Sequence, residues 1–228
     1  MATVAILGAS IDTTSGTHTS TLTPTLNDLI IILTIATGNT STAVATDNQG
    51  GTYTTVFTAR KNTSADTMMI HVRNKLVSSA VSTIYSHAPG ASTGGGLAVY
   101  RVAGMSRAGL QAIRQYAIQE NQASAIPAPV FGTAVLTANA CIGAIFNATN
   151  PAAMTSPTGW SEEGDSGYNS PTTGYQSCRR NSGETGTTIT WGSLSVLGFC
   201  SAVVELDTTG VPKQDIKPLV QAVHRSNL

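Results

Sequence analysis

The chain has 228 residues, enough for one large β-sandwich or two small domains with a substantial core. Only 11% of the residues are charged, against about 25% in ordinary soluble domains, and the 12 Lys and Arg balance the 12 Asp and Glu. This neutrality excludes a global field that would draw the chain to nucleic acid or to an anionic membrane. A charge-poor surface has little electrostatic protection against self-association and suits a protein inside an assembly. A soluble, threonine-rich sandwich that happens to be neutral would have the same composition.

The start of the chain lacks the features of a secretory signal. MATVAILGASIDTT has no basic region before its apolar stretch, and that stretch is short and continues into strand-like sequence. The longest apolar run, 29–36, falls well short of the roughly 20 residues that a membrane helix needs. The 3 cysteines lack metal-type spacing, and Cys141 and Cys200 stand in apolar runs as small hydrophobic residues do. We therefore expect synthesis in a reducing cytoplasm, with no metal and no cofactor.

The sequence of the first half of the chain indicates four or five strands. An unbroken apolar run, DLIIILTIAT over 28–37, indicates a strand that is covered on both faces. A turn follows in TDNQGGTYTTV over 46–56, because glycine supplies positive φ without steric cost. TMMIHVRNKL from 67 is a strand with a basic end, and the alternation of STIYSH over 82–87 indicates a half-buried strand. GLAVYRVAG from 96 closes the half.

The link between the halves, MSRAGLQAIRQYAIQENQ over 105–122, fits two conformations. Leu110, Ile113 and Ala117 stand at helical spacing, and Ser106 could cap a helix. The same residues allow an extended strand from 112 to 120. We favour an extended or irregular crossover over 106–128, because an all-β chain needs a bridge between its halves.

The second half repeats the segment types of the first in the same order, offset by roughly 105 to 111 residues. Its segments are NACIGAIFNAT (139–149), SPTGWSEEG (156–164), GYQSCRR (174–180), TTITW (187–191) and GFCSAVVELD (198–207). We therefore predict an all-β fold, a two-sheet, jelly-roll-like sandwich with an internal pseudo-repeat. The predicted sandwich is a single domain over 1–210, with half-repeats at about 22–105 and 129–208.

The predicted core consists of the apolar residues of these strands. Tyr53 and Trp160 should occupy matching positions in the two halves. The residues expected to be buried are Leu29, Ile31, Leu33, Ile70, Val99, Val102, Ile142, Ile145, Val203 and Leu206.

The last residues, 211–228, lie beyond the repeat and predict a C-terminal arm outside the sandwich. Pro212 and Pro218 prevent this segment from forming one helix. A frayed tail is the alternative, but the apolar residues of the arm need burial somewhere. The arm residues that we expect to contact a partner are Lys213, Lys217, Leu219, Val220 and Val223.

Several catalytic patterns can be weighed, and each is incomplete. GDSG over 164–167 matches the surroundings of the chymotrypsin-type serine, but no histidine of the chain has the sequence context that this mechanism needs. Glu162, Glu163 and Asp165 could form a glycosidase pair, but we favour a solvated charged loop. These residues or Asp47 could bind calcium, but the alternating oxygen ligands of a calcium-binding loop are absent. No phosphate-binding glycine loop and no zinc spacing occurs. We therefore expect no enzymatic activity.

Three aromatic residues of the second half, Trp160, Tyr168 and Tyr175, could contact a partner or stack against a glycan. We expect two of the three to lie in the core or in an intersubunit contact.

These segments together resemble the β-sandwich virion proteins of tailed bacteriophages, of the head-decoration or cement type. The resemblance lies in the strand opened by Asp28, the TDNQGGTYT and PTGWSEEG turns, MMIHVRN, LAVYRVAG, QSCRR and SAVVELD, and it covers roughly 3–208. It implies a structural role on the capsid exterior after synthesis in the bacterial host cytoplasm. The implied partners are the major capsid protein and copies of the chain itself, as a trimer, with no nucleic acid and no membrane. A tail- or fibre-associated adhesin, or a carbohydrate-binding module with a glycan ligand, is the alternative.

Overall fold

The structure is a computed structural model that describes residues 1–13, 16–62, 65–147, 155–169, 172–192 and 196–208. The described residues form β-strands and one short 3-10 turn, Gly109–Ala112, with no α-helix among them. This confirms the all-β fold class. Within the same residues no helix is long and apolar enough to cross a membrane. The segment 211–228, expected to be an arm, lies outside the described residues.

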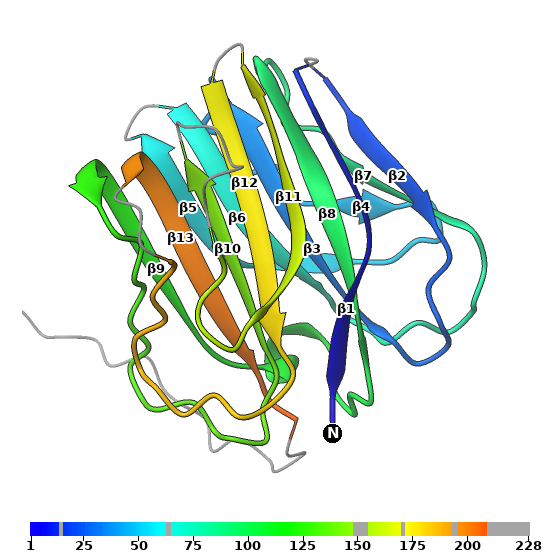
Figure 1. Cartoon of the computed structure of the whole chain (residues 1–228). Coiled ribbons are helices and arrows are strands. Elements are labelled where there is room, and N and C mark those ends of the chain that lie inside the picture. The colour runs from blue at the N-terminus through cyan, green and yellow to red at the C-terminus, as the bar shows by residue number, and fades with distance from the viewer. Residues whose placement is uncertain (14–15, 63–64, 148–154, 170–171, 193–195, 209–228) are drawn as a thin grey trace, which may run out of the picture.

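The strands form two large antiparallel sheets and one small sheet (Figure 1). The first large sheet has the order β1-β8-β3-β6-β5, the second β11-β12-β10-β13-β9, and the small sheet β2-β7-β4. The first half of the chain has more strands than the four or five expected, because two strands precede the first predicted segment and the turn segment over 46–56 contains strand residues of its own. Its strands are β1 (Thr3–Asp12), β2 (His18–Leu22), β3 (Leu29–Thr37), β4 (Thr46–Asp47), β5 (Tyr53–Asn62), β6 (Ala65–Arg73), β7 (Thr83–His87) and β8 (Gly94–Ala103). The second half supplies β9 (Ile113–Ala125), β10 (Cys141–Asn147), β11 (Ser161–Asn169), β12 (Thr172–Arg180) and β13 (Val196–Leu206).

The internal repeat is visible in the strand order. Read from the other edge, the second large sheet is β9-β13-β10-β12-β11, which places the strands of the second half in the order of their first-half counterparts. In the first half the chain passes back and forth between the first large sheet and the small sheet, as in a jelly roll. In the second half, 127–131 runs beside 187–191 through Phe131 N to Thr187 O (2.8 Å) and Trp191 N to Pro127 O (2.9 Å). The second half therefore repeats the strand order of the first large sheet and places a pair of adjacent segments where the first half has β2 and β7.

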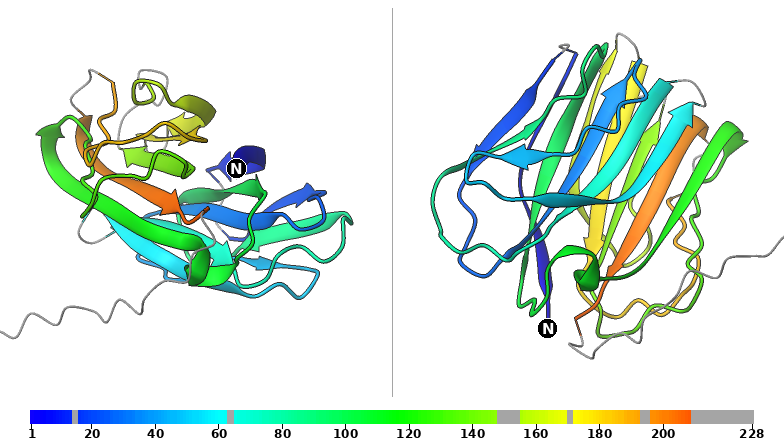
Figure 2. Two further views of the ribbon diagram at one scale, coloured as in Figure 1. Left: turned by 90° about the horizontal axis from the view of Figure 1, so that it is seen from below. Right: turned by 180° about the vertical axis from the view of Figure 1, so that it is seen from behind.

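The two halves pack through their large sheets, and smaller layers cover the outer faces (Figure 2). The central cluster joins residues such as Ile31 and Val102 of the first sheet to Ile142 and Val204 of the second. A second cluster lies between the first large sheet and the small sheet, and a third lies on the outer face of the second large sheet. Strands β3 and β10 are buried at every position, because each lies mid-sheet between two layers. All ten residues predicted for the core are buried.

The turn positions also match between the halves. Tyr53 pairs with Arg73, and Ser161, which follows Trp160, pairs with Arg179. Each hairpin has a β-bulge three residues after its aromatic residue, at Val56 in the first half and at Glu163 in the second. Tyr53 and Trp160 are both buried. The prediction that these two residues occupy matching positions is confirmed.

The link between the halves is extended, as favoured from the sequence. Residues 113–125 form β9, which pairs with β13 along most of its length. In the sheet order β9 stands where β1 stands in the first half, so the link supplies a sheet strand as well as a bridge. The helical spacing of Ile113 and Ala117 has no structural counterpart, because both side chains are buried from a strand.

Side chains from the opposite half bind to both edge strands of the first large sheet. On β1, the Val4 N–H donates to Asn181 Oδ1 (2.8 Å) and the Ile6 N–H to Glu163 Oε2 (2.7 Å). On β5, the Arg60 N–H donates to Glu120 Oε1 (2.7 Å). An unpaired strand edge is a template for further pairing, and these three bonds occupy part of it.

Candidate functional site

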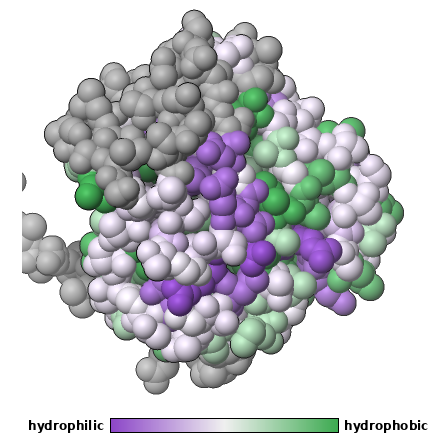
Figure 3. Space-filling view, in the orientation of Figure 1, coloured by the Kyte–Doolittle hydropathy of each residue, from purple (hydrophilic) through white to green (hydrophobic). Residues whose placement is uncertain are grey.

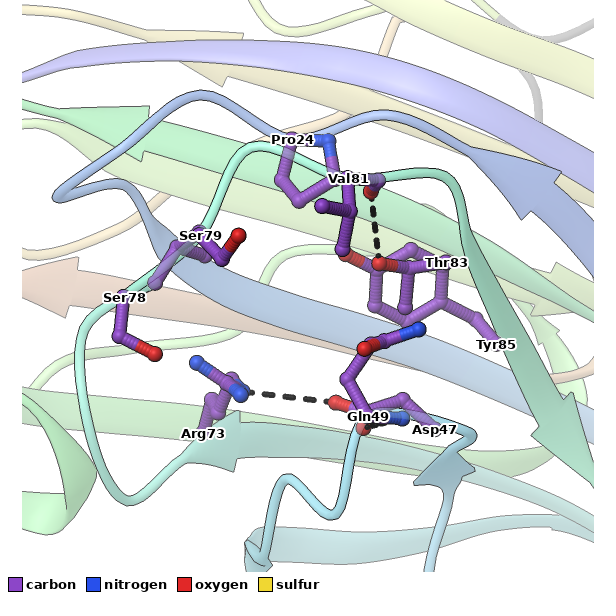
Figure 4. Close-up of a pocket in the computed structure, with 10 residues that line it drawn as sticks. Pro24, Asp47, Gln49, Arg73, Ser78, Ser79, Val81, Thr83 and Tyr85 are labelled. Carbon is purple, nitrogen blue, oxygen red and sulfur yellow. Dashed lines mark hydrogen bonds and ion pairs between the residues drawn. The ribbon is translucent and has the colours of Figure 1, made fainter.

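A buried carboxylate anchors the glycine turn of the first half (Figure 4). Asp47 Oδ1 accepts the backbone N–H groups of Gln49 (2.9 Å) and Gly51 (2.8 Å). Its Oδ2 accepts the Tyr53 hydroxyl (2.7 Å) and lies 3.4 Å from Arg73 Nε. Burial, and then the hydrogen bond to Asp47, raises the pKa of Tyr53. All the bonding capacity of this carboxylate is used inside the protein.

The second half builds the same arrangement from different residues. Glu184 Oε1 accepts the backbone N–H groups of Thr185 (3.0 Å) and Gly186 (2.9 Å). Its Oε2 accepts the Trp160 indole N–H (2.9 Å) and lies 3.1 Å from Arg180 Nη1. Burial opposes ionisation of Glu184, but these backbone and indole donors and Arg180 hold its pKa below the usual range. In both halves, one carboxylate therefore ties a loop to an aromatic residue and an arginine.

Shallow hollows lie beside the two anchors. The first-half hollow has a volume of about 80 Å³ and is lined by Gln49, Arg73, Ser79, Thr83 and Tyr85 among others. The second-half hollow, beside Trp160 and Arg180, has a volume of about 250 Å³. A third, at Gly51 and Lys75, has about 120 Å³. All three are smaller than the roughly 300 Å³ at which ordinary small-molecule sites begin.

Most charges of the described residues are paired within the chain. Seven ion pairs connect strands and loops of the described residues. They are Lys61–Asp66, Arg73–Asp47, Arg101–Asp28, Arg107–Asp207, Arg114–Glu205, Arg179–Glu163 and Arg180–Glu184. On the face that Figure 3 shows, strongly hydrophilic residues form a central band and smaller patches, with residues of intermediate hydropathy and hydrophobic residues beside them. The charged side chains therefore mainly hold the fold together.

Glu205 is the most deeply placed of these carboxylates, with none of its surface exposed. Leu136 N–H (2.9 Å) and Asn139 Nδ2 (2.6 Å) donate to Oε1. Arg114 Nη1 and Gln115 Nε2 donate to Oε2. Four donors satisfy this group, so it holds the loop before β10 against β9 and β13.

The acidic residues weighed as a glycosidase pair lie on the edge strand β11, so the expectation of a charged loop there is wrong. Glu163 binds Arg179 as well as the Ile6 N–H, and Glu162 accepts Gln176 Nε2 at 3.2 Å. Burial, and then the Glu162 charge, raises the pKa of Asp165. Ser166 of the GDSG segment is also on β11, and its side chain is outside the described ones. His18, His71 and His87 lie instead on β2, β6 and β7 of the first half.

The aromatic residues proposed for partner contacts are placed as follows. Tyr175 is 1% exposed, and its hydroxyl lies within hydrogen-bonding distance of the Tyr100 hydroxyl (3.2 Å) and Ser177 Oγ (2.9 Å) in the central core. Trp160 is 8% exposed and its ring belongs to the outer cluster of the second half. Tyr168 is on β11, with its side chain outside the described ones. Lys213, Lys217, Leu219, Val220 and Val223 lie outside the described residues.

The three cysteines are free and buried, and burial raises the pKa of each thiol. Among the described residues no group of three or more His, Cys, Asp or Glu side chains could hold a metal ion. The paired anchors and the Glu205 network were missed from the sequence. The shared basic ends at Arg73 and Arg180 were their only local signal.

Comparisons of the chain with protein-family models, with curated proteins and with solved structures found no match.

Proposed function

We propose that the chain is a structural protein of a tailed-bacteriophage virion, a decoration or cement protein that binds the outside of the capsid. The observation that carries this proposal is that the carboxylates of the candidate site are hydrogen-bonded within the protein itself. The carboxylates of Asp47, Glu184 and Glu205 already accept several donors each, and the hollows are small. A partner would therefore contact a broad surface of small polar and apolar side chains, not these carboxylates.

Part of that surface is apolar enough to support packing against neighbouring subunits. Tyr116 (47% exposed) and Ile118 (41% exposed) are two positions apart on β9, so they face the same side of the strand. The Tyr116 ring also packs on Phe57 of β5, with ring centroids 5.8 Å apart, which holds it in place without burying it. Other exposed apolar side chains are Leu26, Val44, Val81, Ile84, Leu110, Ile126, Val130 and Leu136.

A cement protein needs many modest contacts and no active site, because copy number converts weak contacts into strong attachment. A surface with few unpaired charges favours such packing, since little charge has to be desolvated at each contact. We propose the major capsid protein and further copies of the chain, as a trimer, for the partners. The segment 211–228 is proposed to reach across a subunit boundary.

The test is the copy number of the chain in purified virions of the phage that encodes it. Hundreds of copies per particle support a place on the head, whereas a few to a few dozen would move the proposal to the tail or fibre. A chain that stays a soluble monomer and never co-purifies with particles would contradict the proposal.

Deletion of 211–228 should weaken particle binding. The double substitution Tyr116→Ser with Ile118→Ser should weaken particle binding independently while leaving the fold intact.

A further inference from the structure

Three of the four histidines of the chain meet in one buried layer of the first half. His18 of β2 and His87 of β7 are directly opposite each other in the small sheet. His71 of β6 lies on the first large sheet, with its ring centroid 6.5 Å from that of His87. The three side chains are 3% exposed or less. The cluster therefore bridges the contact between the small sheet and the first large sheet.

The surroundings of His71 suit a neutral ring. Its Nε2 lies 3.1 Å from Thr34 Oγ1 and its Nδ1 lies 3.1 Å from Thr55 Oγ1, so both nitrogens have uncharged partners. Gly95 of β8 leaves room for the cluster, because a Cβ there would lie 3.1 Å from His18 Nε2 and 2.5 Å from Ile35 O. A hydroxyl can serve either nitrogen of a neutral imidazole, but it offers no counter-charge to an imidazolium.

The charged groups on the surrounding strands are engaged elsewhere. Asp47 of β4 is paired with Arg73 of β6, Asp28 before β3 with Arg101 of β8, and Asp66 of β6 with Lys61 of β5. Burial raises the pKa of Tyr53, and burial followed by the Asp47 charge raises that of Tyr85 to about 12, so both hydroxyls stay neutral. Asp12 of β1 pairs with Gly95 in the sheet, and its side chain is outside the described ones.

Protonation of His71 and His87 is accordingly unfavourable in the closed structure. Burial, and then His87, lowers the pKa of His71 to about 3. Burial, and then His18, lowers the pKa of His87 to about 4, although the Gly96 and Ala43 carbonyls partly offset this. A histidine released into water has a pKa of about 6.5.

The second half shows that the fold does not require these histidines. The position of His71, two residues before Arg73, corresponds to Cys178, two residues before Arg180. The position of His87 at the end of β7 corresponds to Trp191 at the end of the 187–191 segment, and His18 corresponds to Pro127 opposite it. A Cβ on Gly143 would lie 3.0 Å from Cys178 Sγ and 2.9 Å from the Trp191 ring, so these two residues meet in the same layer. Residues that stay neutral throughout the range from pH 4 to pH 7.5 thus fill the equivalent space.

We propose that His71 and His87 form an acid-sensitive latch, which holds the small sheet on the first large sheet at neutral pH and releases it in acid. Release would uncover the apolar outer face of the first large sheet, including Ile30, Ile32, Leu97 and Val99. The second half, which has no histidine at the equivalent positions, stays closed. This proposal is independent of the function proposed above.

The direction follows from proton binding. Between about pH 6.5 and pH 4 the open form binds more protons than the closed form, so the closed form loses stability as the pH falls through this range. At pH 5 each histidine favours opening by about 30-fold, and the two together by roughly a thousandfold relative to pH 7.5. Above pH 7 both histidines are neutral in either form and exert no such effect.

The test is amide hydrogen exchange on the full chain at pH 7.5 and pH 5, with rates corrected for the intrinsic effect of pH. We expect protection in 18–22 and 83–87 to fall by at least a hundredfold at pH 5. Protection in 127–131 and 187–191, the matched internal control, should change little. Both tryptophans, Trp160 and Trp191, are in the second half, so unchanged tryptophan fluorescence would show that the opening is local.

Variants test whether His71 and His87 cause the loss of amide protection at pH 5. His71→Gln with His87→Phe should abolish the acid response, whereas His224→Gln, a histidine outside the described residues, should leave it intact. The proposal is overturned if wild-type protection in 18–22 and 83–87 is unchanged at pH 5, if both halves open together, or if the double variant keeps the response. Should the double variant fail to fold, proton NMR titration of the wild-type histidines decides. Two rings must stay unprotonated down to pH 5 in the closed form, and ordinary titration of all four near pH 6.5 contradicts the latch.

Discussion

Replacing Glu205 by glutamine tests whether buried polar groups hold the second half together. The carboxylate has no exposed surface and accepts four donors, of which Arg114 is charged and only 25% exposed. A glutamine has one acceptor oxygen, so its amide N–H₂ would face two donors and Arg114 would lose its counter-charge. Removing one partner of a buried ion pair costs about 3–5 kcal/mol, because the other charge stays buried without compensation.

Urea unfolding followed by tryptophan fluorescence measures this loss, since both tryptophans are in the second half. In a chain of this length, a loss of about 3–5 kcal/mol should lower the melting temperature by roughly 6–20 °C. Glu162→Gln is the matched control: the same chemical change at an exposed site should cost about 0.5 kcal/mol or less. If Glu205→Gln costs less than about 1 kcal/mol, the network does not stabilise the fold as argued.

Three further predictions concern the core and its buried reactive groups. Ile31→Ala and Val203→Ala should each cost about 2–5 kcal/mol in urea unfolding, and a loss below about 0.5 kcal/mol would mean that the strand faces are assigned wrongly. Trp160→Phe should cost about 1–3 kcal/mol, because it leaves Glu184 without its indole donor; an unchanged unfolding midpoint would show that this anchor is unimportant. Cys141, Cys178 and Cys200 should resist a thiol reagent in the native protein and all react after denaturation, and rapid native labelling would contradict their burial.

The large-scale fold could be predicted because its signals are local and repeated. The unbroken apolar run over 28–37 identified β3 as a strand with two covered faces, and β3 is buried throughout. The recurrence of an aromatic residue after each glycine turn identified Tyr53 and Trp160 as equivalent. These conclusions needed only hydrophobic pattern and order along the chain.

The remaining features depend on pairing between distant segments. The link could not be assigned with certainty because Ile113 and Ala117 fit both a helical face and a strand, and the pairing of β9 with β13 decides between them. The histidine layer exists only because β2 pairs with β7 and the pair covers β6. Likewise, Glu205 meets Arg114 across 91 residues of chain, a distance at which sequence spacing carries no information.

The side chains that bind to the edges of the first large sheet bear on the aggregation tendency of so uncharged a chain. Strand-rich proteins with little net repulsion are prone to stack edge to edge into fibrils, and general charge cannot prevent this here. The side chains of Asn181 and Glu163 accept backbone N–H groups of β1, and the side chain of Glu120 accepts one of β5. These N–H groups are therefore not available to another strand. Protection of these two strand edges therefore depends on three contacts between the halves. If the two halves separated, these edges would become accessible and fibril formation would become more favourable.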